Sequence, residues 1–233
     1  MQLAKPCLDV GVFTQRKDEM LAFYRDEVGL PYEELLPVGG GVQQHRHGLN
    51  GSVFKLNHSR DALEDLPAAG YRKLHIARAG LAAPRELVDP DGNALRLVPP
   101  GTDGIEAIRI DIAVHDLATH RRFWGEVFGA LDIGGDRFSV GTTQIALSSA
   151  PGARAAHADA GSGGAAMRGR GFRYLTVQVF DVVQEHARMV AAGAWEGRAP
   201  NVLGSVARIS FVRDPDGNWI EISQRKSLTG SLD

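Results

Sequence analysis

The chain has 233 residues, of which 43% are hydrophobic, and its formal net charge is -2. That is enough apolar material for one large core or two small ones, and the lack of a long basic run argues against a nucleic-acid surface. The single cysteine, Cys7, excludes an internal disulfide and a cysteine-rich zinc site, and no apolar run approaches membrane-spanning length. We therefore expect a soluble, cytoplasmic protein that binds neither nucleic acid nor membrane.

The first predicted unit begins with a strand at residues 8–14. Asp18 is the expected N-cap of a helix whose apolar residues recur at helical spacing, and Gly29 is the expected stop. Three further strands follow, at residues 32–38, 42–47 and 52–57. The order of this unit is βαβββ.

The second predicted unit is shorter. A strand at residues 71–79 is followed by Gly80 to Pro84 where a helix would be expected, and Arg78 lies on the face that this helix would have covered. A hairpin comes next, with its tip at Asp89-Pro90-Asp91-Gly92-Asn93, because proline presets a turn dihedral and glycine supplies a positive φ.

Residues 105–149 repeat the order of the first unit. Asp116 is the expected helix N-cap and Gly129 the expected stop, and strands are predicted near residues 137–140 and 143–148. Residues 149–170 are rich in Ala, Gly, Ser and Arg, and we expect a flexible loop there, either a tether or a lid over a pocket.

The fourth unit starts with a strand at residues 172–180, after which Asp181 and Gln184 resemble a capping box. The unit closes with a hairpin at residues 206–224, whose tip repeats the earlier turn as Asp214-Pro215-Asp216-Gly217-Asn218. A polar tail is expected at residues 227–233. The matched turns, helices and first strands indicate an internal repeat.

A series of βαβββ units that ends in Asp214-Pro215-Asp216-Gly217-Asn218-Trp219-Ile220-Glu221-Ile222 resembles the vicinal oxygen chelate superfamily. That superfamily includes glyoxalase I, bleomycin-resistance proteins and extradiol dioxygenases. The resemblance implies an α+β fold in which units pair into two cupped mixed sheets. We expect an N-terminal domain at residues 1–101, from units one and two, and a C-terminal domain at residues 102–226, from units three and four.

In this superfamily a divalent metal is held by His and Glu residues on the first and last strands of the units. In the C-terminal cup, Glu221 keeps the closing-strand glutamate, whereas Arg109, Tyr174 and Ala146 stand at the other positions. In the N-terminal cup the positions fall on Asp9, Lys55, Lys73 or His75, and Arg96.

Neither cup supplies the three protein ligands that a catalytic metal site usually needs. We therefore expect no metal and no other cofactor, and predict that an ion pair between Arg109 and Glu221 replaces the metal. The alternative is one iron, manganese or zinc ion whose ligands lie off the family positions, with Glu221, His75 and Asp9 as the first candidates to test.

Alternation along the strands predicts which residues face each cup. In the C-terminal cup these are Arg109, Asp111, Tyr174, Thr176, Gln178, Trp219, Glu221 and Ser223. In the N-terminal cup, the cations near Asp9 favour an anionic ligand. A buried salt-bridge network without function is the other reading of the C-terminal set.

We therefore predict a protein that binds a small polar metabolite in the C-terminal cup. In an enzymatic version Glu221 is the general base and Tyr174 donates a hydrogen bond to a developing oxyanion. The alternative is a metal-dependent lyase, isomerase or ring-cleaving dioxygenase. The expected partner is a small-molecule ligand or substrate, and a homodimer remains open.

Overall fold

The computed structural model describes residues 1–152 and 167–232, and these form the four expected units. The first unit contains β1 (Leu3–Thr14), α1 (Lys17–Ala22), a π-helical turn η1 (Phe23–Glu27), β2 (Tyr32–Gly39), β3 (Val42–Leu49) and β4 (Ser52–Ser59). The second unit contains β5 (Tyr71–Ala77), β6 (Arg85–Val88) and β7 (Ala94–Val98).

The third unit follows a short 3-10 helix, η2 (Thr102–Gly104). It contains β8 (Ile108–Val114), α2 (Leu117–Arg122), a π-helical turn η3 (Phe123–Phe128), β9 (Leu131–Asp132), β10 (Arg137–Val140) and β11 (Thr143–Ser149). The fourth contains β12 (Gly171–Val179), α3 (Val182–Ala191), β13 (Trp195–Leu203), β14 (Ala207–Arg213) and β15 (Trp219–Arg225), and α4 (Lys226–Thr229) follows it.

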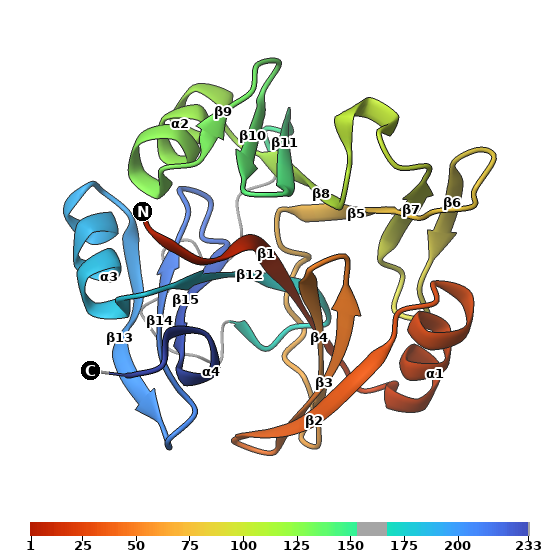
Figure 1. Ribbon diagram of the computed structural model, residues 1–233, viewed down its shortest axis with the longest axis horizontal. Coiled ribbons are helices and arrows are strands. Elements are labelled where there is room, and N and C mark those ends of the chain that lie inside the picture. The colour runs from red at the N-terminus through yellow and green to blue at the C-terminus, as the bar shows by residue number, and fades with distance from the viewer. Residues whose placement is uncertain (153–166, 233) are drawn as a thin grey trace.

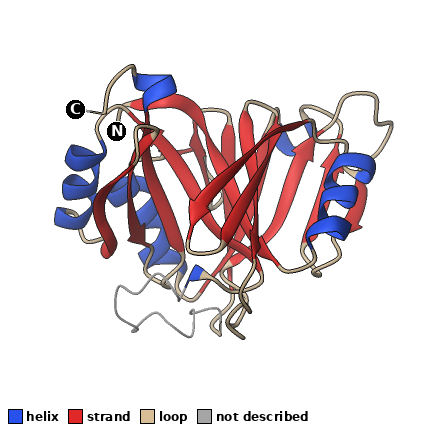
Figure 2. Cartoon of the chain, turned by 90° about the horizontal axis from the view of Figure 1, so that it is seen from below, coloured by secondary structure: helices blue, strands red, loops and turns tan. Residues whose placement is uncertain are grey.

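The strands form two mixed sheets, which confirms the expected α+β class. The larger sheet has the order β13-β14-β15-β12-β1-β4-β3-β2, and the smaller has the order β6-β7-β5-β8-β11-β10-β9. Figure 1 shows β1 and β12 crossing the middle of the molecule, and Figure 2 shows the strands at the centre with helices on both sides.

The expected pairing of the units is wrong. β1 pairs antiparallel with β12, so units one and four share the eight-stranded sheet, and β5 pairs antiparallel with β8, so units two and three share the other. The two sheets are therefore not the halves at residues 1–101 and 102–226. Alternation along a strand determines which residues share a face, but not which strand becomes its neighbour.

The two sheets pack back to back around one apolar core. In β1, Leu8, Val10 and Val12 join a cluster that also contains Leu74 and Ile110 from the smaller sheet. The residues between them in β1 face the other way. We call the two outward-facing concave surfaces the eight-strand cup and the seven-strand cup.

Two of the predicted helix caps are confirmed and one is wrong. Asp116 Oδ1 accepts a hydrogen bond from Thr119 N at 2.7 Å, and Asp181 Oδ1 accepts one from Gln184 N at 3.0 Å. Asp18, however, lies in the first turn of α1, because the helix begins at Lys17 and its N-cap is Arg16, two residues before the expected cap. A carboxylate in the first turn is still favourable next to the helix N-terminus.

The missing helix of the second unit is confirmed within the described residues 78–84. In its place, Arg78 Nη1 donates hydrogen bonds to the carbonyls of Val28 at 2.7 Å and Gly29 at 2.9 Å. These carbonyls end the helical segment of the first unit, so the arginine satisfies acceptors that a helix end leaves open.

The repeated turns connect units two and four. Asn218 Oδ1 accepts a hydrogen bond from Gly70 N at 2.6 Å, and Asn93 Oδ1 accepts one from Phe172 N at 3.3 Å. Each repeated asparagine therefore binds the start of the other unit's first strand.

Most of the predicted loop at residues 149–170 lies outside the described residues, which resume at Met167. The expected tail at residues 227–233 begins instead within the short helix α4. None of the helices in the described part of the chain combines the length and apolar character that crossing a bilayer requires.

Candidate functional site

The eight-strand cup contains a cavity of about 490 Å³. Its walls come from β2 at one edge of the sheet and from β13, β14 and the turn between them at the other edge, and its base comes from β3, β4 and β15. Its lining residues are Leu36, Pro37, Val38, Gly39, Gln44, Arg46, Lys55, Leu203, Gly204, Val206, Ala207, Ile209, Glu221, Ser223 and Arg225. This volume lies within the range of natural ligand pockets.

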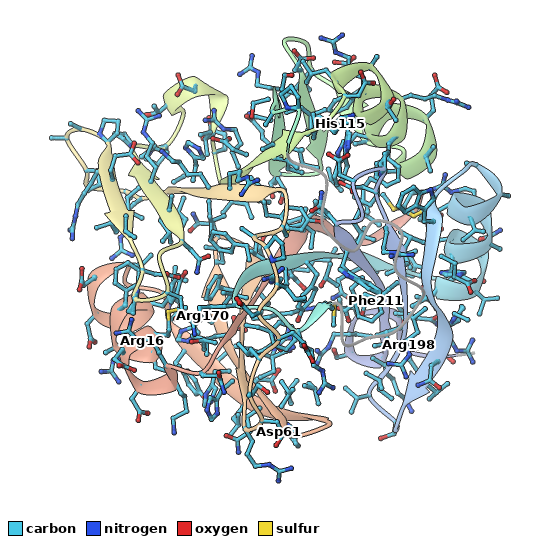
Figure 3. The ribbon with its side chains drawn as sticks, turned by 180° about the vertical axis from the view of Figure 1, so that it is seen from behind. Arg16, Asp61, His115, Arg170, Arg198 and Phe211 are labelled. Atoms are coloured by element: carbon cyan, nitrogen blue, oxygen red, sulfur yellow. The ribbon has the colours of Figure 1, made fainter. Side chains whose placement is uncertain are left out.

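A smaller cavity of about 140 Å³ shares Gln44, Leu203 and Glu221 with the first. Phe211 and Arg198 line it from the paired strands β14 and β13, where Figure 3 labels them. The two cavities together form the hollow of the eight-strand cup.

The ammonium group of Lys55 lies at the centre of the polar base. Its Nζ donates to Glu221 Oε2 at 2.8 Å and to Thr176 Oγ1 at 2.7 Å. Thr176 Oγ1 in turn donates to the same carboxylate oxygen at 2.7 Å. These bonds hold one oxygen of Glu221, and no described group donates to Oε1 of this cavity-lining carboxylate.

Asp9 is the second carboxylate near this ammonium. It is fully buried, and its Oδ2 lies 3.9 Å from Lys55 Nζ and accepts from Gln178 Nε2 at 3.2 Å. Its Oδ1 accepts from Lys5 Nζ at 2.7 Å and from Val53 N at 2.9 Å. Burial alone would raise the pKa of Asp9, but the charges of Lys55 and Lys5 outweigh it, so this pKa lies below its ordinary value.

The side chain of Tyr174 crosses over β1 and reaches β3 and β4 of the first unit. Its hydroxyl accepts hydrogen bonds from Asn57 Nδ2 at 3.1 Å and Gln44 Nε2 at 3.3 Å. This path is open only because residue 11 is glycine: a Cβ there would overlap the tyrosine ring. Burial, with the charge of Glu221 nearby, raises the pKa of Tyr174 well above its ordinary value, so the hydroxyl keeps its proton.

The hydroxyl proton of Tyr174 has no acceptor within hydrogen-bond distance among the described residues. Because the residue also lines the smaller cavity, this O–H is available to a ligand. Ser223 lines the larger cavity. Trp219 lines neither; its ring packs edge-on against Phe211 at 5.9 Å between centroids, and we assign it a supporting position.

The remaining predicted residues lie in the seven-strand cup, because the units pair differently from expectation. Arg109 Nε donates to Asp111 Oδ1 at 2.9 Å, and His75 Nε2 lies 2.7 Å from Asp111 Oδ2. Lys73 and Arg96 both pair with Glu86, at 3.1 and 3.3 Å. The predicted ion pair between Arg109 and Glu221 is therefore wrong: each is paired within a different sheet.

Four polar residues of the eight-strand cup were missed by the sequence analysis: Gln44, Arg46, Asn57 and Arg225. The first three lie on β3 and β4 at alternate positions, so the face they share was visible in the sequence. What was not visible is that this face meets β12 and β15.

Within the described residues, the carboxylates of Asp9, Glu221 and Asp111 in the two cups are paired with cationic side chains. Among the described residues no group of three or more His, Cys, Asp or Glu side chains is placed to hold a metal ion. In the eight-strand cup the two carboxylates of Asp9 and Glu221 share a lysine ammonium, which a metal ion would have to displace. In the seven-strand cup, His75 and Asp111 are joined by an arginine.

Comparison with known proteins gives one family match. Residues 107–222, which hold the third unit and nearly all of the fourth, match the model of the Glyoxalase/Bleomycin resistance protein/Dioxygenase superfamily.

Solved structures that resemble this chain over more than nine-tenths of its length include those of three different proteins. Glyoxalase I from Zea mays has a TM-score of 0.73 at 16% sequence identity, covering 94% of this chain and 92% of that one. A candidate dioxygenase from Bacillus subtilis has a TM-score of 0.66 at 12% identity, covering 97% and 86%. The cppA protein from Streptococcus pneumoniae has a TM-score of 0.53 at 8% identity, covering 96% and 100%. At these identities the likeness is one of fold.

Proposed function

Because this chain belongs to the Glyoxalase/Bleomycin resistance protein/Dioxygenase superfamily through residues 107–222, we propose that it binds a small polar metabolite in the eight-strand cup without a metal ion. The proposal concerns the cavity of about 490 Å³ and its polar base of Lys55, Glu221 and Tyr174. The ligand lies between the apolar walls and accepts or donates hydrogen bonds at this base.

The observation that carries the proposal is the position of Lys55. Asp9, Lys55, Tyr174 and Glu221 stand at the positions where the superfamily resemblance implies metal ligands, and pairing of units one and four brings all four into one cup. The lysine ammonium lies 2.8 Å from Glu221 and 3.9 Å from Asp9. We propose that this ammonium replaces the metal charge, because it neutralises Glu221 and, together with Lys5, the buried Asp9.

The metal-dependent alternative has less support. Its first candidate ligands were Glu221, His75 and Asp9, but His75 lies in the seven-stranded sheet and pairs with Asp111. A metal at the eight-strand cup would retain only two of these three candidates.

A second candidate function is metal-independent proton transfer in the same cup. Glu221 lines the cavity and its Oε1 accepts no hydrogen bond from a described group, so this oxygen can accept a proton from a bound substrate. Tyr174 keeps its proton and has no described acceptor for it, so it can donate to an oxygen that gains negative charge. In this version the ligand is a substrate that undergoes isomerisation or elimination.

Metal content is the first test. We expect protein purified without chelators or a histidine tag to contain no stoichiometric iron, manganese or zinc by mass spectrometry. A stoichiometric amount of any one of them, lost on substitution Glu221→Gln, would overturn the metal-free proposal.

A ligand screen is the second test. We expect some small acids, phenols and amides to raise the melting temperature, and expect Val206→Trp, at the cavity wall, to abolish this response. The matched control is Val183→Trp on α3, since Val183 and Val206 are 48% and 50% exposed. A full response in Val206→Trp would show that ligands bind elsewhere. Loss of turnover but not of binding in Tyr174→Phe would identify the enzymatic version.

A further inference from the structure

Two arginines line one side of the eight-strand cavity. Arg46 comes from β3 of the first unit and Arg225 from the end of β15 of the fourth, so they meet only because these units share a sheet. Their side chains are 7% and 18% exposed. Arginines this deeply buried are normally compensated by paired carboxylates.

Among the described residues, one carboxylate lies within ion-pair distance of the two arginines. Oε1 of Glu34 lies 3.1 Å from Arg46 Nε and 3.9 Å from Arg225 Nη2. Glu34 is on the edge strand β2 and its side chain is 46% exposed, so water screens both contacts. Arg46 Nε makes no well-aligned hydrogen bond among the described residues, and Arg46 Nη1 donates only to the neutral Gln44 Oε1, at 3.1 Å.

The local charge is therefore unbalanced. Two guanidinium groups and one carboxylate leave a net charge of one positive unit beside the cavity. Burial, and then the positive charge of Arg46, lower the pKa of Arg225, which is the effect expected when two cations are close. The second ion-pair set of the cup is balanced, because the charges of Lys5 and Lys55 offset those of Asp9 and Glu221.

The rest of the cavity is apolar along its walls. Leu36 and Val38 lie on one side, and Leu203, Val206 and Ile209 on the other. A ligand that satisfies both features has an apolar body and one negatively charged end. A guanidinium fork matches a carboxylate in shape, and a single net positive charge matches a monoanion better than a phosphate dianion.

We propose that Arg46 and Arg225 form an anion subsite at the side of the cup, and that the ligand is a carboxylic acid with an apolar body. The carboxylate of the ligand lies between the two guanidinium groups and competes there with Glu34. The opposite end of the ligand reaches Glu221 Oε1 and the hydroxyl of Tyr174. This inference rests on the proposed function, because it names the ligand class of the same cavity.

The test compares acids with neutral molecules of the same shape. Phenylacetate and octanoate are titrated against phenylacetamide and octanamide by isothermal calorimetry, with inorganic phosphate as a further anion. We expect the acids to bind about tenfold or more tightly than their amides, since a charge-assisted bond is lost in each amide. Equal binding of acid and amide, or binding of phosphate but of neither acid, overturns the carboxylate assignment.

The variants locate the subsite. We expect Arg225→Gln and Arg46→Gln each to weaken acid binding about tenfold or more while leaving amide binding unchanged. Glu34→Gln removes the competing carboxylate and is expected to strengthen acid binding several-fold, whereas a structural role for Glu34 alone would weaken it or leave it unaltered. Arg208→Gln is the matched control, because Arg208 lies between the cavity-lining Ala207 and Ile209 and faces the other way.

Further variants cover a folding failure of Arg46→Gln. Arg46→Lys retains the charge but loses the planar guanidinium fork, and Arg225→Gln tests the subsite near the end of its strand.

Two further results keep the inference separate from the proposed function. If Val206→Trp abolishes binding of neutral ligands while acids never bind, the proposed function stands and the anion subsite is wrong. If no compound of any class binds the cavity, both fail.

Discussion

Lys55 and Glu221 are 166 residues apart in the chain, yet their side chains form a buried ion pair of 2.8 Å. Their strands, β4 and β15, belong to different units and are separated in the sheet by β12 and β1. The pair links the first and last units across the base of a cavity. Under the proposed function, its lysine ammonium supplies the charge that a metal ion supplies in the superfamily resemblance.

Removal of the ammonium tests how much the cup depends on it. Lys55→Met leaves Asp9 and Glu221 buried without their shared cation, and we expect the free energy of unfolding to fall by about 3–5 kcal/mol. Urea denaturation at neutral pH measures this change. The control is Lys17→Met, which breaks an exposed pair with Asp18 and should cost less than about 1 kcal/mol.

A double variant separates lost charge from lost packing. Adding Glu221→Gln to Lys55→Met removes one orphaned carboxylate, so the double variant should be more stable than the single lysine variant. If Lys55→Met alone unfolds at the same urea concentration as the wild type, the ammonium does not compensate these carboxylates.

Glycine at position 11 is expected to be essential to the placement of Tyr174. In Gly11→Ala the new Cβ overlaps the tyrosine ring, so the ring must leave its bonds to Asn57 and Gln44. We expect a loss of about 1–3 kcal/mol in stability, measured by thermal unfolding, together with a weaker ligand response. A stable variant that retains its full ligand response would contradict this geometry.

Gly125→Ala is the matched control for this substitution. A Cβ at Gly125 would meet Phe138 at 3.6 Å, an ordinary contact, and the residue lies in a helical segment where alanine is favoured. We expect this variant to be at least as stable as the wild type.

Asp214 gives a prediction about pH. Burial raises its pKa to about 6, above its ordinary value of about 4. The folded state therefore favours the protonated form, so the contribution of Asp214 to stability is full below about pH 4 and is lost as the pH rises through about 6. The free energy of unfolding of the wild type minus that of Asp214→Asn should fall over this range, by up to about 3 kcal/mol.

Asp216 is the control with the opposite sign. Burial would raise its pKa, but the His120 imidazole at 3.1 Å and the hydrogen bond from the His115 backbone N–H outweigh burial and lower it. Its contribution is therefore present above the ordinary aspartate pKa and is lost as the pH falls below it. The free energy of unfolding of the wild type minus that of Asp216→Asn should therefore rise with pH in the acid range. If the differences for Asp214→Asn and Asp216→Asn change with pH in the same direction, the assignment is wrong.

The repeated turns allow a comparison of equivalent residues. Asn218 is 1% exposed and joins Asp214 to Gly70 through hydrogen bonds of 2.8 and 2.6 Å. Asn93 makes the corresponding bonds at 2.7 and 3.3 Å in a less buried turn. We expect Asn218→Ala to cost about 2–3 kcal/mol and Asn93→Ala about 1 kcal/mol in chemical denaturation, because buried groups left unpaired cost more.

Much of the local structure could be predicted from the sequence. Asp116 and Asp181 were predictable as helix caps, and Gly29 and Gly129 as helix stops, because capping needs a short side-chain acceptor and the chain turns there with φ of 74° and 87°. The faces of the strands followed from their period of two residues, so Asp9, Lys55, Tyr174 and Glu221 were correctly expected to face a cup.

The choice of neighbouring strands was decided only by the tertiary structure. No local pattern in β1 predicts that its partner is β12, because the backbone hydrogen bonds along a strand edge are the same for every sequence. Both strands are also apolar enough to be central in a sheet. That choice put Lys55 beside Glu221, moved Arg109 to the other sheet, and brought Arg46 next to Arg225. The sequence therefore determined which side chains face a cup, and long-range packing of two sheets around one core determined which of them meet.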